Sequence, residues 1–189
     1  MRITGRHYYN GPDHSINDQH ASELSEIITA IYAVNAADYR IQLSKEKTME
    51  GRVLYSSTAL HKAFRSAFAV LGWKNIRVQP DDSVQYYIGG YLPPATKRRA
   101  IRDMDFVKNR LVVQVQFGRY FFMLENIAAK LAVFKNLGII DAGVEIMPVQ
   151  KFATEMTSGM SYFEQLMSDL ENGGRSYIDI PILIVGIAP

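Results

Sequence analysis

The stretch from Asp105 to Phe117, DFVKNRLVVQVQF, carries the strongest structural signal in the chain. Its polar KNR triplet has turn composition and is followed by an apolar run rich in strand-forming residues, so it predicts a β-hairpin. Residues two apart on a strand point to the same face, so Gln114 and Gln116 project together. The hairpin would bring the Asp105 carboxylate beside these two amides. This pattern suits a metal-and-water site on adjacent strands, or a half-buried hairpin whose glutamines hydrogen-bond one another.

The composition is typical of a globular protein without disulfides. The chain has 189 residues, 48% of them hydrophobic, and no cysteine. This length predicts one domain over residues 1–189, and the lack of cysteine excludes disulfides, thiolate nucleophiles and cysteine-based zinc sites. The net charge of +2 neither supports nor excludes a nucleic-acid partner, because basic groups can cluster. No apolar run reaches the length of a membrane span, so we expect a soluble, cytoplasmic protein without a membrane partner.

Hydrophobic periodicity predicts strands and helices that interleave without strict βαβ alternation. Besides the hairpin, we expect strands at residues 1–9, 39–43, 53–55, 84–88, 144–147 and 180–187, and helices at 22–36, 56–71, 122–137 and 162–170. Ser22 is an expected N-cap, as is one of the hydroxyl residues at 56–58. The last strand is nearly all apolar, which is typical of an interior strand covered on both faces. We therefore expect an α/β fold with a mixed central β-sheet flanked by helices on both faces.

The hairpin resembles the active-site hairpin of the BglII/BstYI family of type II restriction endonucleases, which is related to BamHI and belongs to the PD-(D/E)XK superfamily. That family has Asp-Phe, then an acid nine positions after the Asp, then Gln-Phe two positions further on. Here Asp105-Phe106 and Gln116-Phe117 match, and Gln114 occupies the position of the acid. Further similarity lies at Tyr120, Phe122, the apolar-rich stretch 123–137, Tyr162-Phe163-Glu164-Gln165 and the run 180–187. The similarity covers the second half of the chain well and the first half loosely, and it implies a restriction-endonuclease-like core.

The resemblance implies hydrolysis of phosphodiester bonds in duplex DNA with Mg²⁺, or with Mn²⁺ as a substitute. Mg²⁺ prefers oxygen ligands, commonly one or two carboxylates with waters and phosphate oxygens. By this resemblance, Asp105, the Gln114 side chain and the backbone carbonyl of Val115 would bind the cation. Gln116 would lie near the attacking water.

Gln114 departs from the family pattern, because an amide oxygen carries no formal negative charge. Unit charges about 4 Å apart interact by roughly 4 kcal/mol at an effective dielectric of about 20, so losing one costs roughly tens- to a thousand-fold in metal occupancy or rate. The residue suits a variant made to trap substrate, a natural copy that binds DNA but cuts poorly, or a site whose acid comes from elsewhere. Glu125, early in the helix expected at 122–137, is the candidate replacement. Its alternative role is that of an exposed first-turn acid favourable to the helix dipole.

Two groups of residues are expected to contact DNA. The basic run before the hairpin, which is either a solvated face or a phosphate-binding surface, comprises Lys97, Arg98, Arg99 and Arg102. The resemblance assigns base recognition to the segment after the active-site strand and to a later loop, which here contain Arg119, Thr157 and Ser158. A phosphate contact is the alternative role for Arg119.

Members of this family cut palindromes with a GATC core as homodimers, so the resemblance implies a homodimer on a GATC-centred duplex. The helix expected at 56–71 is one candidate dimer surface, and its apolar side is alternatively core. A competing hypothesis is a non-cleaving or catalytically impaired DNA-binding protein of the same fold. A more distant one is a repair-type or structure-selective nuclease that shares only the hairpin. No zinc site is expected, because zinc-binding spacing is absent around the four histidines, His7, His14, His20 and His61.

Overall fold

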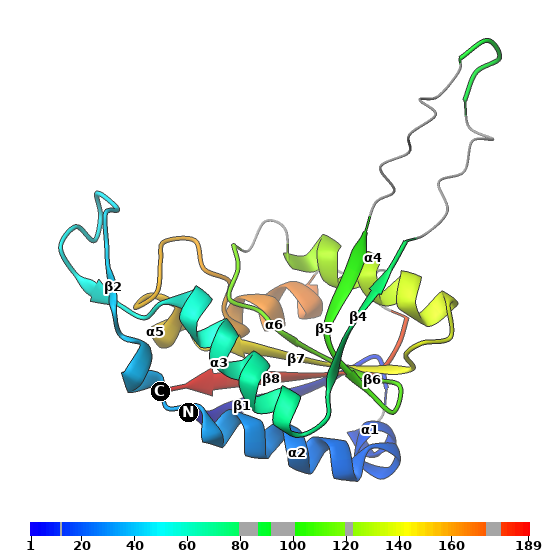
Figure 1. Cartoon of the computed structure of the whole chain (residues 1–189), viewed down its shortest axis with the longest axis horizontal. Helices are drawn as coiled ribbons and strands as arrows, with labels where there is room; N and C mark the ends of the chain where they lie inside the picture. The colour runs from blue at the N-terminus through cyan, green and yellow to red at the C-terminus, as the bar shows by residue number, and fades with distance from the viewer. Residues whose placement is uncertain (12, 80–86, 92–100, 120–122, 173–178) are drawn as a thin grey trace.

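The computed structural model describes the chain except for residues 12, 80–86, 92–100, 120–122 and 173–178 (Figure 1). Within the described part, six strands form a mixed sheet in the order β1-β8-β7-β6-β5-β4. These strands are β1 (Arg2–Tyr9), β4 (Lys74–Val78), β5 (Arg102–Lys108), β6 (Leu111–Val115), β7 (Ala142–Pro148) and β8 (Ile182–Ala188). Strands β6, β7 and β8 run parallel, whereas the pairs β1–β8, β5–β6 and β4–β5 are antiparallel. A separate short pair joins β2 (Gln42–Leu43) to β3 (Val53–Leu54).

Helices cover both faces of this sheet, which confirms the predicted α/β architecture. One core cluster contains residues of α2 (Ala21–Ala33), α3 (Ser57–Val70) and α5 (Gln150–Ala153), and the other contains residues of α4 (Met123–Asn136) and α6 (Phe163–Asn172). The apolar side of α3 is fully buried in the first cluster through Leu60, Phe64 and Phe68. That side of α3 is therefore core. None of the helices in the described ranges is long and apolar enough to cross a membrane.

Several local predictions are confirmed and others are wrong. Ser56 caps α3 by accepting a hydrogen bond from the backbone N–H of Ala59 (3.3 Å), and all seven residues of β8 are buried. Ser22 is not a cap, because α2 starts directly after α1 (Asp13–Gln19) with His20 as its N-cap. Of the expected strand 39–43, only Gln42 and Leu43 form a strand, β2; Tyr39 is the last residue of the short helix η1 (Ala36–Tyr39), and residues 40–41 are irregular. Of the expected strand 84–88, only the last two residues lie in the described part, and they are not in a strand; β4 was missed instead.

The turn between β5 and β6 is a two-residue loop formed by Asn109 and Arg110. Both residues have positive φ, 47° and 68°, as a type I′ hairpin turn requires. The unusual backbone of Arg110 is held in place by its side chain, which donates to Asp141 Oδ2 (2.7 Å) and to the Gly138 carbonyl (2.6 Å). The predicted polar turn is therefore confirmed.

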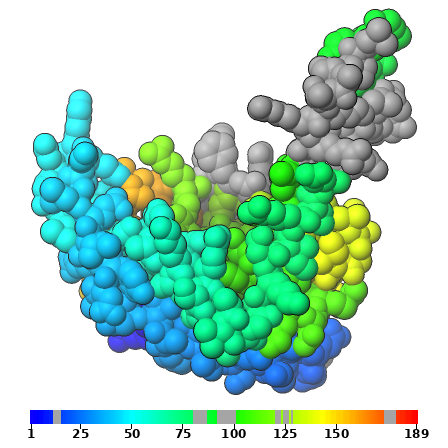
Figure 2. All heavy atoms as spheres, in the orientation of Figure 1, coloured from blue at the N-terminus to red at the C-terminus, as the bar shows by residue number. Residues whose placement is uncertain are grey.

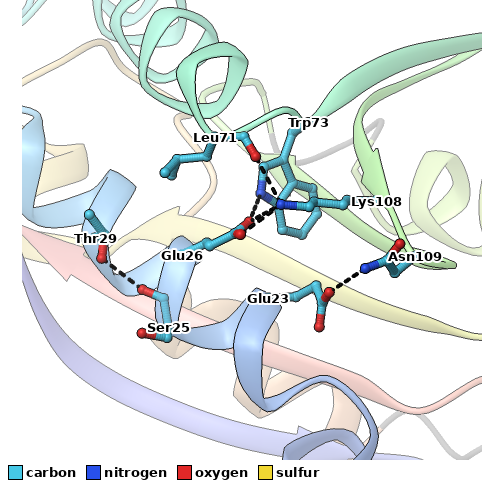
Figure 3. A network of polar contacts seen from close by, with 8 residues as sticks. All are labelled: Glu23, Ser25, Glu26, Thr29, Leu71, Trp73, Lys108 and Asn109. Atoms are coloured by element: carbon cyan, nitrogen blue, oxygen red, sulfur yellow. Dashed lines mark hydrogen bonds and ion pairs between the residues drawn. The ribbon is translucent and has the colours of Figure 1, made fainter.

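The same turn is fastened to α2 by a polar network (Figure 3). Lys108 Nζ lies 2.6 and 2.8 Å from the two carboxylate oxygens of Glu26, and Asn109 donates to Glu23 at 2.6 Å. Glu26 also accepts a hydrogen bond from the indole of Trp73 at 2.8 Å. Because Trp73 is buried in the first core cluster, this network ties the position of the hairpin to the core.

Candidate active site

Asp105 lies on β5, one residue beyond the last antiparallel pair between β5 and β6. That pair is Phe106–Val113, so Asp105 and Gln114 come next along the two strands. The Asp105 side chain is 22% exposed, and its Oδ2 lies 3.3 Å from Nε2 of His61 on α3. The carboxylate therefore remains accessible while a neighbouring helix fixes its orientation.

The two glutamines have different partners and do not bond one another. Gln114 is buried and donates from Nε2 to the Met104 sulfur at 3.3 Å. Gln116 donates from its side-chain amide to Glu145 Oε2 at 2.9 Å, and its backbone N–H donates to the Ile146 carbonyl at 2.7 Å. The hydrogen bond from the Gln116 backbone extends the β6–β7 ladder one residue past the end of β6 and fixes the direction of the Gln116 side chain.

Glu145 is a buried carboxylate in the middle of the sheet. It lies on β7, where it is the parallel register partner of Gln114, and it is 1% exposed. Burial raises the pKa of Glu145 to about 8; the Gln116 hydrogen bond opposes this shift, the charge of Asp105 adds to it, and Lys130 opposes it. Oε1 of Glu145 is buried without a hydrogen-bond partner in the described part of the chain. Glu145 therefore belongs to the electrostatic environment of Asp105.

A cleft of about 490 Å³ opens between α3 and the end of β6, and its lining includes His61, Lys62, Arg65 and Gln116. The two cations are exposed on the side of α3 opposite the core. In the space-filling view, the upper edge of the molecule is hollowed between the cyan β2–β3 segment and the green strands β4 and β5 (Figure 2). A larger cavity of about 680 Å³ lies beside β1 and the end of α6, and none of the hairpin residues lines it. The smaller, cationic cleft is the one associated with the candidate site.

The structure brings together the residues expected to read bases, although they are far apart in sequence. Arg119 forms an isolated antiparallel bridge with Met160, which places it beside the loop carrying Thr157 and Ser158. Glu46 holds this loop by accepting from the Thr157 hydroxyl and from the Ser158 backbone N–H (3.0 Å). These hydrogen bonds, Thr157 first, and the charge of Arg119 keep the pKa of Glu46 below its usual range.

The remaining predicted residues lie largely outside the described part of the chain, and their roles, like those above, stay predictions. Lys97, Arg98 and Arg99 lie outside the described residues, whereas Arg102 begins β5 in register with Val78. Glu125 lies in the first turn of α4, and its side chain is outside the described part. Among the described residues, no group of three or more His, Cys, Asp or Glu is arranged to hold a metal ion. Any cation site there must therefore combine one or two carboxylates with other oxygen atoms.

Sequence reasoning missed three residues of this region. His61 has a recognisable signal, because it shares the polar side of an amphipathic helix with Lys62 and Arg65. Glu145 has a stronger sequence signal, because it is the single charged residue in the apolar run AGVEIMP. Glu46 has no recognisable sequence signal, because an acid in a polar turn is common and its partners, Thr157 and Ser158, lie far away in the sequence.

The chain is similar to known proteins over nearly its full length. The family model described as "Restriction endonuclease BglII/BglIII" matches residues 5–187. The type II restriction enzyme BglII of Bacillus subtilis is 23% identical over 185 residues, which is 95% of this chain and 73% of that protein. The fold is similar to a crystal structure of BglII complexed with a DNA 16-mer, with a TM-score of 0.70, and to free BglII, with a TM-score of 0.61. Each of these BglII chains is 21% identical in sequence to this chain. The similarity covers 100% of this chain in both cases, 79% of the BglII chain in the DNA complex and 80% of the chain of free BglII.

Proposed function

The chain belongs to the BglII/BglIII family of restriction endonucleases, and we propose that it uses Mg²⁺ to cut duplex DNA at a palindromic site with a GATC core. Membership of this family makes it a type II site-specific deoxyribonuclease. The observation that carries the proposal is the accessible carboxylate of Asp105, which follows the Phe106–Val113 pair of the hairpin and contacts His61, within a chain that the family model matches almost end to end.

The atoms around Asp105 suit a hard divalent cation, with Mn²⁺ as a substitute for Mg²⁺. Asp105 offers a carboxylate, Gln114 an amide oxygen and Val115 a backbone carbonyl. Glu145 adds a buried carboxylate oxygen that lacks a hydrogen-bond partner among the described residues. When bound, the cation would polarise the phosphate and lower the pKa of the attacking water. The acidic side chain of Glu125 is a further candidate ligand.

The protein's own side chains position this site and the DNA. His61 orients the Asp105 carboxylate, and Gln116, held by Glu145, faces the cleft where the attacking water would lie. Lys62 and Arg65 of α3 are placed to contact backbone phosphates along the same cleft. The basic run Lys97, Arg98, Arg99 and Arg102 is proposed to extend this phosphate-binding surface.

Sequence recognition is proposed for Arg119, Thr157 and Ser158. Arginine pairs with guanine through two hydrogen bonds, and hydroxyl groups contact base edges. The bridge between Arg119 and Met160 supports a common role, because it joins the two segments. Glu46 holds the Thr157 hydroxyl, so this contact must be exchanged or shared when DNA binds.

A two-fold symmetric site implies a homodimer, with each copy reading one half of the palindrome. The apolar side of α3 is buried in the core and its polar side lines the cleft, so the dimer surface is expected elsewhere. A cytoplasmic location follows from the proposed DNA substrate.

The direct test is digestion of unmethylated DNA rich in GATC sites, with Mg²⁺ or Mn²⁺. The parent protein should cut it, and Asp105→Asn should abolish cutting while leaving specific binding largely intact. Asp103→Asn is the matched control, since this acid lies two residues earlier on β5 and is 41% exposed beside Arg77. Cutting by Asp105→Asn at the parent rate would place the active site elsewhere.

Gln114 supports a second candidate function, a catalytically impaired or non-cleaving DNA-binding protein of the same fold. Its signature would be salt-sensitive, specific binding of a GATC duplex by the parent without cutting under any metal condition. A Gln114→Glu variant that also binds without cutting would establish this second function over the first.

A further inference from the structure

Glu145 occupies a position in the sheet where an apolar residue is expected. Strand β7 lies between β6 and β8, and all seven of its residues are buried. Charged side chains are almost never fully buried unless they are paired or bind a metal. In its ionised form, Glu145 therefore needs a counter-charge that its strand does not provide.

The contacts of Glu145 leave one oxygen available for such a partner. Oε2 accepts the amide hydrogen bond of Gln116, which fixes the carboxylate in one orientation. Oε1 is buried and has no hydrogen-bond partner in the described ranges. A buried oxygen left unpaired is costly, so Oε1 is the atom at which a ligand would gain most.

We propose that Glu145 is the second carboxylate of the divalent-cation site, binding the cation together with Asp105 and supplying the charge that Gln114 lacks. This inference rests on the proposed function and names a ligand that the hairpin motif does not include. Gln114 and Glu145 are partners in the parallel β6–β7 ladder, and neighbouring strands lie about 4.8 Å apart. An acid at position 145 is thus displaced from position 114 by only one strand and projects from the same face.

Two carboxylates are what Mg²⁺ commonly takes from a protein, with waters and phosphate oxygens completing its shell. A site built on Asp105 and Glu145 agrees with the lack of any three-residue metal cluster in the described part of the chain. The competing role for Glu145 is structural, as an anchor for Gln116. Glu145→Gln separates the two roles, because glutamine keeps an acceptor oxygen for Gln116 but removes the charge.

The test is Mn²⁺ binding to the whole protein without DNA, measured by electron paramagnetic resonance of free Mn²⁺. Glu145→Gln should weaken binding by roughly tens-fold or more, as expected for loss of one nearby charge. The double variant Gln114→Glu/Glu145→Gln, which swaps acid and amide across the ladder, should restore affinity to within a few-fold of the parent. Glu171→Gln, at an exposed acid of α6, is the control and should leave binding unchanged.

Each outcome separates this inference from the proposed function. If Asp105→Asn abolishes Mn²⁺ binding and Glu145→Gln does not alter it, Glu145 is no ligand while the cation site at Asp105 stands. If the parent binds no Mn²⁺, both proposals fail. Should Glu145→Gln fail to fold by circular dichroism, the double variant carries the test: weak binding by a folded double variant overturns the inference, and parent-like binding supports it.

Discussion

Glu26 joins the β5–β6 hairpin to the core, and its removal should destabilise the protein measurably. Its carboxylate binds the Lys108 ammonium through both oxygens and accepts the Trp73 indole N–H (Figure 3). Lys108 keeps only one other contact, the Leu71 carbonyl at 2.9 Å, among the hydrogen bonds of the described residues. Glu26→Ala would leave a buried indole N–H unpaired and would remove the carboxylate that contacts the half-buried ammonium of Lys108.

The expected loss follows from these two effects. Trp73 is 4% exposed, so its unpaired N–H costs about 1–3 kcal/mol. The ion pair is about one-quarter exposed on both sides, so its loss adds about 1 kcal/mol or slightly more. Glu26→Ala should therefore lower the free energy of unfolding by about 2–4 kcal/mol. Glu26→Gln should cost less, because its amide oxygen still accepts from the indole.

Urea denaturation followed by tryptophan fluorescence suits this test, since Trp73 is the single tryptophan of the chain and lies in the network. Glu155→Ala is the control: its ion pair with Arg40 (3.1 Å) is more exposed and should contribute less than about 1 kcal/mol. A double-mutant cycle of Glu26→Ala with Lys108→Met isolates the pairwise coupling. The reasoning is refuted if Glu26→Ala is no more destabilising than Glu155→Ala and the cycle shows no coupling.

Two further predictions concern pH and salt. Burial raises the pKa of Glu145 from 4.5 in the unfolded chain to about 8 in the folded protein without divalent cations. Between these two values the folded state binds a proton that the unfolded state has lost, so the free energy of unfolding should fall as pH rises through this window. In EDTA, urea titrations should show Glu145→Gln gaining up to about 5 kcal/mol over the parent between pH 4.5 and pH 9, and parallel pH profiles would contradict the assigned environment. Lys62→Ala and Arg65→Ala should each reduce the salt dependence of DNA binding by about 0.9 in log–log slope, measured by fluorescence anisotropy. Lys151→Ala, on α5 and away from the cleft, is the control, and unchanged slopes in the α3 variants would exclude that helix from phosphate contact.

The parts of the fold predicted from sequence are those encoded by local patterns. In helix α3, the spacing of Leu60, Phe64 and Phe68 marks the apolar side that is buried in the core, and the N-cap is Ser56, one of the three hydroxyl residues predicted for this role. Strand β4 reads KNIRV, which contains only two apolar residues, and it becomes a strand through pairing with β5. Likewise, α2 starts directly after α1, and no single residue in the sequence predicts this boundary. Tertiary contacts override local propensity in both cases.

The same division holds for the candidate site. Asp105, Gln114 and Gln116 could be predicted together because one hairpin carries all three, and hairpin spacing can be recognised in the sequence. His61 reaches Asp105 from a separate helix, and Glu145 reaches Gln116 from a separate strand, so neither contact has a fixed spacing along the chain. The sequence does offer a chemical signal for Glu145, because it is the single charged residue of an otherwise apolar strand.

The departure at Gln114 takes on a different meaning once the sheet is known. A cation responds to the charge and position of its ligands, not to their order along the chain, and register partners in a parallel ladder project from the same face. Moving the acid from β6 to β7 therefore keeps a second carboxyl group near Asp105, which would be ionised when a cation is bound, while breaking the linear motif. The buried, incompletely paired carboxylate of Glu145 favours an acid supplied from elsewhere over a simple loss of charge. On this argument the sum of charge across the β5–β6–β7 ladder, rather than the residue at position 114, sets the affinity for the cation.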